Sequence, residues 1–259
     1  MGSAGRAARS PTLVLRSSAG AAAKSADGGV IDKRVASAAA AVAGIAHGAT
    51  ILIGGFGESG VACELIDALV EQGAGDLTVV ANNAGSGDAG VAALLRAGRV
   101  SRVICSYSRS SGSVWFERRY AEGSVHLEVV PQGTLSERIR AAGAGIPAFY
   151  TLTGVGTELA AGKETRRFGG REYVLEYALP GDVALIRARR ADRWGNLVYH
   201  SVARNYGPTM AAAAARTLVQ VDEPVVELGG LDPEEIVTPG IYVDSVVFAP
   251  PGAGTGGTQ

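Results

Sequence analysis

Apolar residues recur along the chain in two alternating patterns. Short β-branched runs such as Thr50–Ile53 are typical of buried strands, and the segments that follow them carry apolar residues at the spacing of amphipathic helices. We predict strands at 50–53, 77–81, 100–106 and 125–130, and helices at 30–46, 61–70, 90–97, 114–121 and 134–142. This alternation indicates an α/β fold with a mostly parallel open sheet flanked by helices on both faces, whose ligand site lies at the carboxyl ends of the strands.

The C-terminal half is less regular. Residues 149–170 are rich in glycine and are predicted to be irregular, whereas short apolar runs predict strands at 173–177, 183–188 and 197–200. We expect these three strands to form an antiparallel addition to the sheet, followed by a helix at 204–216 and a strand at 217–221. Because no linker-like break and no internal repeat divides the chain, residues 30–248 are expected to form one domain.

The two ends of the chain lack the apolar positions that a core needs. Residues 1–29 are mainly Ala, Ser and Gly with basic residues against the single acid Asp27, which indicates a disordered extension. A transit peptide has a similar composition, but this segment shows no apolar face. Residues 249–259, with adjacent prolines and repeated glycines, are expected to be a flexible tail.

Composition excludes several classes of function. A net charge of -1 over 259 residues provides no electrostatic basis for binding nucleic acid or an anionic membrane surface, and no apolar run reaches transmembrane length. The three histidines lie far apart without paired cysteines or carboxylates, so no metal site is expected. Cys63 and Cys105 fall in a predicted helix and a predicted strand, which is typical of packed, reduced thiols in a cytoplasmic protein.

A glycine-rich loop follows the strand at 50–53. It comprises Gly54, Gly55, Phe56, Gly57, Glu58, Ser59 and Gly60. Because glycine permits positive φ and close backbone approach, the N–H groups of the loop and the positive end of the next helix can face a phosphate or carbonyl oxygen. The loop also fits the G-x-G-x-x-G dinucleotide pattern, and a third interpretation is that the glycines only permit close packing.

The dinucleotide interpretation requires an acidic residue at the end of the next strand, where it would bind the ribose. The predicted strand at 77–81 ends instead in Asn82 and Asn83, and no carboxylate follows before Asp88. A nicotinamide-dependent dehydrogenase therefore stays open only if that carboxylate comes from another part of the chain.

Six segments carry a family resemblance in the same order along the chain. They are residues 47–57, 81–85, 130–140, 142–150, 203–206 and 238–244, and together they span about 30–247. The chain resembles the α subunit of family I 3-oxoacid coenzyme A (CoA) transferases. The resemblance implies ping-pong transfer of CoA between two carboxylic acids, with the acyl-CoA thioester as substrate and no further cofactor.

The resemblance also places the nucleophile outside this chain. In the family, the thioester is attacked by a glutamate that belongs to the partner β subunit, within a Glu-Asn-Gly type of motif. This chain contains no Glu-Asn dipeptide, so no catalytic nucleophile is assigned to it. A heterodimer or heterotetramer with a β subunit is the expected assembly.

The remaining roles follow from the same resemblance. Gly54 to Gly60 are expected to bind CoA, and Asn82, Asn83 and Gln132 to line the substrate site, where fixed donors stabilise charge on a carbonyl oxygen. Asn82 and Asn83 lie just past a strand end, and without the resemblance an ordinary turn would be the preferred interpretation.

The substrate expectation depends on residues 105–113, which look more like family members acting on 3-oxoadipate than like ketone-body members. The guanidinium of Arg109 could clamp the second carboxylate of that acceptor, although Arg109 could equally be an ordinary surface arginine. Succinyl-CoA would be the donor. The alternative acceptor within the family is acetoacetate.

Overall fold

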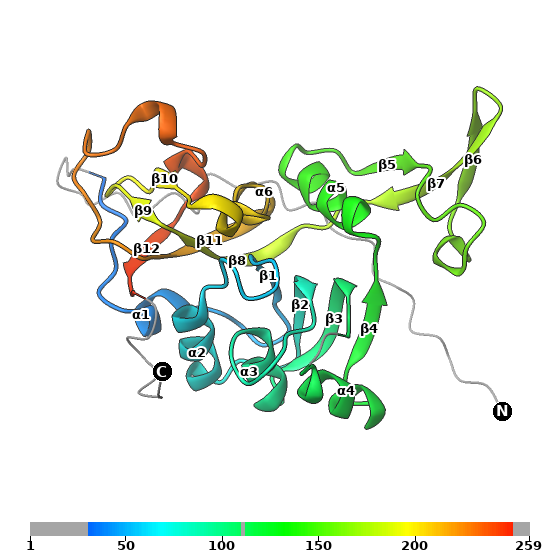
Figure 1. Cartoon of the computed structure of the whole chain (residues 1–259), viewed down its shortest axis with the longest axis horizontal. Coiled ribbons are helices and arrows are strands. Elements are labelled where there is room, and N and C mark those ends of the chain that lie inside the picture. The colour runs from blue at the N-terminus through cyan, green and yellow to red at the C-terminus, as the bar shows by residue number, and fades with distance from the viewer. Residues whose placement is uncertain (1–30, 110–111, 251–259) are drawn as a thin grey trace.

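The central element is a seven-stranded sheet in which every neighbouring pair of strands is parallel (Figure 1). The computed structural model describes residues 31–109 and 112–250. The strand order is β12-β11-β8-β1-β2-β3-β4. The strands are β1 (Thr50–Ile53), β2 (Leu77–Asn83), β3 (Val100–Tyr107), β4 (His126–Val129), β8 (Gly181–Ala188), β11 (Ala214–Val221) and β12 (Ser245–Phe248).

Helices cover both faces of this sheet. On one face pack α1 (Ala38–Val42), α2 (Cys63–Gln72), α3 (Val91–Arg96) and α4 (Val114–Ala121), and on the other pack α5 (Gln132–Gly143) and α6 (Gly207–Ala213). The strands alternate accordingly: Ile51 and Ile53 join the core of the first face, whereas Leu52 joins the core of the second. The predicted fold class is confirmed.

One strand lies in a different sheet from the one predicted. The run at 183–188 is the core of β8, which lies between β1 and β11 and pairs in parallel with both, so the prediction that it belongs to an antiparallel addition is wrong. Its side chains are buried on both faces of the sheet, which is the signature of a central parallel strand.

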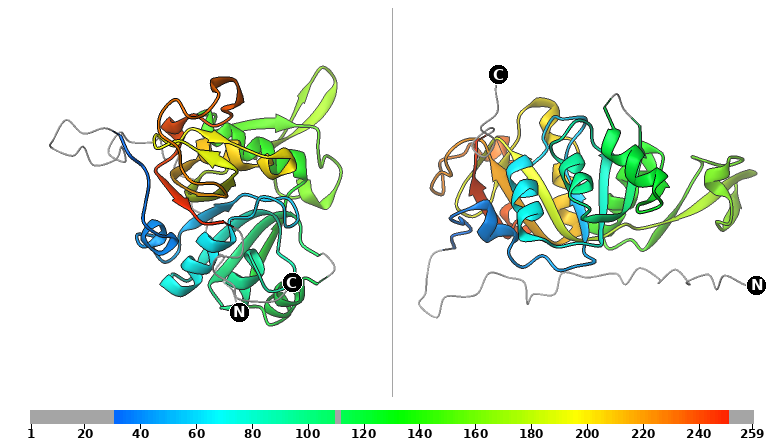
Figure 2. Two further views of the ribbon diagram at one scale, coloured as in Figure 1. Left: turned by 60° about the vertical axis from the view of Figure 1, so that its left-hand side comes forward. Right: turned by 90° about the horizontal axis from the view of Figure 1, so that it is seen from below.

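The antiparallel addition consists of two small sheets. The larger is built from β5 (Ala148–Thr151), β6 (Thr165–Phe168) and β7 (Arg171–Tyr177) in the order β5-β7-β6, and it projects from the body as an arm (Figure 2). The smaller pairs β9 (Arg190–Ala191) with β10 (Leu197–Val198). The expectation that 149–170 is irregular misses β6, because all four of its residues are exposed and provide no apolar pattern.

Buried charges hold the base of the arm. Glu176 of β7 is 4% exposed and pairs with Lys163 at 2.5 Å. Arg138 of α5 donates from Nε to the Tyr177 carbonyl at 2.8 Å and pairs through a second nitrogen with Glu128 of β4, also at 2.8 Å. The arm is thus fixed to the helix whose other end begins at Gln132.

Two predicted helices are shorter than expected. The helix at 30–46 is restricted to α1, because the segment before it is extended and the Val35 N–H donates to the Val246 carbonyl at 2.9 Å. The predicted helix at 204–216 resolves into a 3₁₀ turn, η3 (Ser201–Arg204), then α6, and then the start of β11, where Ala214 pairs with Gly181 of β8. Tertiary strand pairing overrides the helical preference of alanine at both places.

The remaining regular segments are three further 3₁₀ turns, η2 (Glu158–Ala160), η4 (Pro233–Glu235) and η5 (Gly240–Tyr242). Within the described ranges, no helix combines the length and apolar character needed to cross a membrane, and no group of His, Cys, Asp and Glu residues is arranged to hold a metal ion. The predicted disordered extension at 1–29 and all but two residues of the predicted tail lie outside the described residues.

Candidate active site

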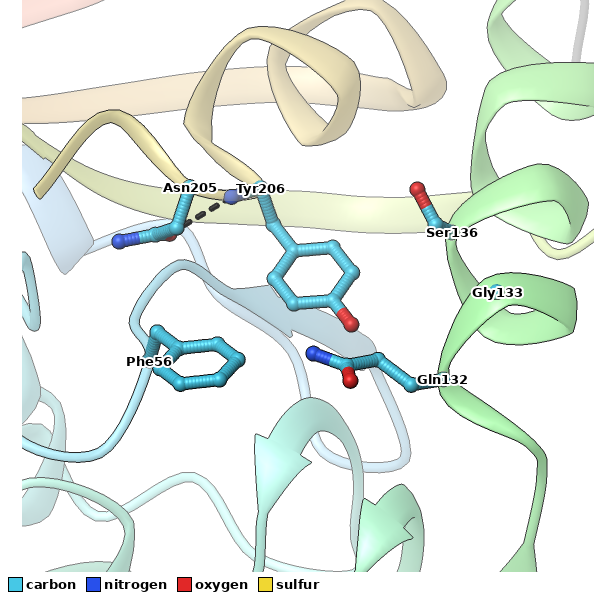
Figure 3. Close-up of a pocket in the computed structure, with 6 residues that line it drawn as sticks. All are labelled: Phe56, Gln132, Gly133, Ser136, Asn205 and Tyr206. Atoms are coloured by element: carbon cyan, nitrogen blue, oxygen red, sulfur yellow. Dashed lines mark hydrogen bonds between the residues drawn. The ribbon is translucent and has the colours of Figure 1, made fainter. Parts of the chain in front are cut away.

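An open cavity of about 370 Å³ lies at the carboxyl ends of the parallel strands. Phe56 comes from the loop after β1, Gln132 follows β4, and Tyr206 begins the approach to α6 (Figure 3). The chain leaves β1 toward β2 on one side of the sheet, while β8 and β11 continue it on the other. Such a switch point is where open α/β sheets bind ligands. The described lining residues are Phe56, Gln132, Gly133, Ser136, Asn205 and Tyr206.

The glycine loop makes a tight turn whose tip faces this cavity. Phe56 and Ser59 exchange backbone hydrogen bonds of 3.0 and 3.1 Å, and Gly57 and Gly60 adopt φ of +59° and +77°. The Phe56 side chain is 51% exposed and points toward Gln132 and Tyr206 in Figure 3. The loop therefore presents an aromatic ring to the cavity.

The helix after the loop is less directly exposed than the sequence suggests. It begins at Cys63 instead of Val61, and the Glu64 N–H donates to the Gln220 side chain at 3.2 Å. Within the loop, the Gly54 N–H donates to the Leu185 carbonyl at 3.0 Å. In the described part of the chain, Gly57 and Glu58 are loop residues whose N–H groups have no protein acceptor. A ligand oxygen would meet these groups before it met the helix end.

A hydrogen-bonded cluster lies beside the cavity and is centred on Asn82, at the end of β2. Its Oδ1 accepts from Ser106 Oγ at 3.1 Å, from Gln132 Nε2 at 3.3 Å and from the Tyr206 hydroxyl at 3.4 Å. Asn82 is only 8% exposed, so these bonds fix its amide. Among the described residues none accepts a hydrogen bond from Asn82 Nδ2, and one N–H of the Gln132 amide is also free to donate.

Tyr206 supplies a neutral donor to the same cluster. It is 7% exposed, and burial raises the pKa of its phenol, an effect that hydrogen bonds with Gln132 and Ser106 partly offset. The hydroxyl therefore keeps its proton at neutral pH and can donate.

The structure separates the two adjacent asparagines. Asn82 joins the cluster, but Asn83 Oδ1 accepts from the Gly85 N–H at 2.8 Å, which is the turn that local sequence favours. Glu58, at the tip of the glycine loop, accepts from Ser86 Oγ at 2.6 Å. Arg109 is exposed beside residues 110–111, outside the described range, and is not among the described residues that line the cavity.

Sequence reasoning misses Ser106, Ser136 and Asn205 as site residues. Tyr206 and Asn205 belong to a segment that only the family resemblance indicates, at 203–206. Ser136 lies one turn after Gln132 on α5, a spacing that a helix starting at 132 would have indicated. Because the predicted helix begins at 134, the pattern does not provide this signal.

The arrangement can stabilise negative charge but offers no evident nucleophile. The described lining residues carry amides, hydroxyls and an aromatic ring, without a carboxylate among them. Burial raises the pKa of Cys63 and of Cys105 to about 11, so neither thiol is ionised at neutral pH. Fixed neutral donors of this kind serve an oxyanion, and the attacking group must come from outside the cavity.

Comparison with known proteins agrees with this geometry. A coenzyme A transferase family model matches residues 35–249. A subunit of the 3-oxoadipate CoA-transferase from Pseudomonas putida is 57% identical over 218 residues, which are 84% of this chain and 94% of that protein. The corresponding subunit of the succinyl-CoA:3-ketoacid coenzyme A transferase from Xanthomonas campestris pv. campestris is 51% identical over 217 residues, or 83% of this chain and 88% of that protein. The crystal structure of glutaconate coenzyme A-transferase from Acidaminococcus fermentans aligns with a TM-score of 0.76 at 25% identity, covering 86% of this chain and 77% of the other.

Proposed function

The chain belongs to the coenzyme A transferase family, and from this premise we propose that it is the α subunit of an enzyme that moves CoA from succinyl-CoA to a 3-oxoacid. The thioester carbonyl is attacked by a glutamate of the β subunit, which expels the CoA thiolate and leaves an acyl anhydride on the enzyme. The thiolate then attacks the glutamyl carbonyl, releases succinate and forms an enzyme thioester. The acceptor carboxylate takes the acyl position in the reverse sequence and leaves as the new CoA ester.

The observation that supports this division of labour is the uncharged polar lining of the cavity. Both attacks place negative charge on a carbonyl oxygen, and Gln132 and Tyr206 supply neutral donors at the cavity wall. The glycine loop offers the N–H groups of Gly57 and Glu58 to an acyl or phosphate oxygen. The chain thus contributes binding and charge stabilisation, and the β subunit contributes the reacting carboxylate.

We propose 3-oxoadipate as the acceptor, with acetoacetate as the alternative. The relatives from Pseudomonas putida and Xanthomonas campestris carry names of these two kinds, and the higher identity is to the 3-oxoadipate protein. A dehydrogenase is disfavoured, because β2 ends at Asn83, whose side chain closes a turn where a dinucleotide site needs a ribose-binding carboxylate.

The assignment of the nucleophile can be tested by the mass of each subunit. When the α and β subunits are incubated with succinyl-CoA and no acceptor, the β subunit is expected to gain the mass of covalently bound CoA, while this chain keeps its unmodified mass. Intact-mass spectrometry of the separated subunits measures both, with free CoA in place of the thioester as the control. A CoA adduct on this chain would place the nucleophile here and refute the proposal.

The acceptor preference can be tested at Arg109. If its guanidinium binds the second carboxylate of 3-oxoadipate, Arg109→Leu is expected to lower kcat/KM for that acceptor about 10- to 100-fold, equivalent to a lost charge-assisted contact, and to spare acetoacetate. Steady-state kinetics of the reconstituted complex at one ionic strength measure both. Arg118, an exposed arginine on α4, provides the matched control as Arg118→Leu. Equal losses for both acceptors, or no loss for either, would exclude Arg109 as a specificity residue.

A further inference from the structure

Asn205 occupies an unusual backbone position between η3 and α6. Its φ of 22° and ψ of -119° lie outside the regions that most residues adopt, although asparagine tolerates positive φ better than other non-glycine residues. Backbone strain of this kind persists only where the surrounding structure holds the residue in place, and it is concentrated at ligand and active sites.

The side chain of Asn205 bridges the glycine loop and the start of α6. Oδ1 accepts from the Gly55 N–H at 2.9 Å and from the Tyr206 N–H at 2.7 Å. Nδ2 donates to the Ser59 carbonyl at 3.1 Å. The two bonds to the loop, at Gly55 and Ser59, therefore lie on either side of the turn that carries Phe56.

The same amide is anchored to its own segment. Nδ2 also donates to the Val202 carbonyl at 3.1 Å and to the Ala203 carbonyl at 3.0 Å. Oxygen and nitrogen of the side chain are thus both fully used, and the amide cannot rotate without losing several bonds.

Close packing reinforces this bridge. A Cβ on Gly60 would lie 2.4 Å from the Ala203 carbonyl oxygen and 2.7 Å from Asn205 Nδ2, so no atom fits between the loop and the 203–205 segment. The loop rests directly on Asn205 on the side away from its open tip at Gly57.

We propose that Asn205 is a positioning residue that sets the conformation of the glycine loop and thereby places Phe56 across the cavity from Gln132 and Tyr206 (Figure 3). This inference rests on the proposed function, in which the loop binds the CoA thioester. Asn205 acts through the loop, so its loss changes how tightly the thioester is held more than how fast the bound thioester reacts.

The decisive substitution is Asn205→Gly, because glycine relieves the positive φ while it removes the amide. If the residue served only the backbone conformation, the glycine variant would behave as wild type. Instead we expect the KM for succinyl-CoA in the reconstituted complex to rise roughly 10- to 100-fold, with kcat changed about threefold or less.

Two controls separate this role from a general loss of stability. Asn196→Ala removes another bridging asparagine, whose amide binds Asp192 at 2.7 Å and the Gly240 N–H at 2.8 Å away from the cavity, and it is expected to leave the KM unchanged. Hydrogen exchange of this chain within the complex supplies a readout that needs no activity: in Asn205→Gly, the amides of 55–59 are expected to exchange faster while those of β1 stay protected.

The outcomes distinguish the inference from the function on which it rests. A wild-type KM in Asn205→Gly, or unchanged exchange of residues 55–59, would overturn the positioning role. Faster loop exchange with a wild-type KM would also overturn it, since binding would then not depend on the held loop. If the wild-type complex transferred no CoA, the proposed function would fail, and the exchange experiment would still decide whether Asn205 holds the loop.

Discussion

Replacing Gln132 with alanine is expected to lower kcat for CoA transfer roughly 10- to 1000-fold while changing the KM for succinyl-CoA far less. Gln132 is the first residue of α5, and its amide donates to Asn82 Oδ1 at 3.3 Å, which holds the side chain at the cavity wall before substrate arrives. A donor fixed in this way interacts best with the oxygen that becomes negative in the transition state, so its removal affects turnover more than binding.

Gln72→Ala is the matched control for this measurement. Gln72 also fixes the backbone through its amide, donating to the Ile45 carbonyl at 2.9 Å, but it lies at the end of α2, opposite the end from which the glycine loop enters. It is expected to leave kcat and KM unchanged in the reconstituted complex. A rise in KM without a fall in kcat for Gln132→Ala would mean that Gln132 orients the substrate and does not stabilise the transition state.

Replacing Gly60 with alanine is expected to lower the free energy of unfolding by about 2–4 kcal/mol, whereas Gly57→Ala should cost only about 1 kcal/mol. Both glycines have positive φ, but a Cβ at Gly60 meets the Ala203 carbonyl oxygen at 2.4 Å and a Cβ at Gly57 meets nothing within 4 Å. The difference between the two variants therefore isolates the steric term, because the conformational term is shared.

Urea unfolding of the two glycine variants, followed by circular dichroism, measures this difference. Gly60→Ala should also move the loop away from the 203–205 segment and so weaken binding of succinyl-CoA. Equal destabilisation of the two variants would contradict the close packing at Gly60.

The sequence predicts the strands and helices whose apolar residues alternate strongly. The bounds predicted for Thr50–Ile53 and for Val114–Ala121 agree with the structure to the residue, because each segment buries one face or both. The pattern does not predict β6, whose residues are all exposed, nor the parallel pairing of β8, since a buried apolar run is compatible with either strand direction. Sheet membership depends on contacts between distant segments, which periodicity does not record.

The candidate site divides along the same line. The glycine loop and Gln132 could be located because each follows a predicted strand, where parallel sheets collect their ligand residues. The bridge from Asn205 to Gly55 could not, because it joins two loops far apart in the chain. Asn82 and Asn83 illustrate the limit of local reasoning: adjacent and identical in type, they differ only in the face of β2 from which each side chain projects.

The position of β1 in the sheet also affects how this chain folds during synthesis. Ile51 pairs with Val79 on one side and with Val183 on the other, so one neighbour of β1 emerges from the ribosome soon after it and the other only after α5 and the whole arm. Contacts between such distant segments slow folding, because a long loop must close first. Until β8 is made, the apolar strand Thr50–Ile53 has an open edge that can pair with another nascent chain. A strand that lies in the middle of the finished sheet is therefore an exposed edge while the protein is being made.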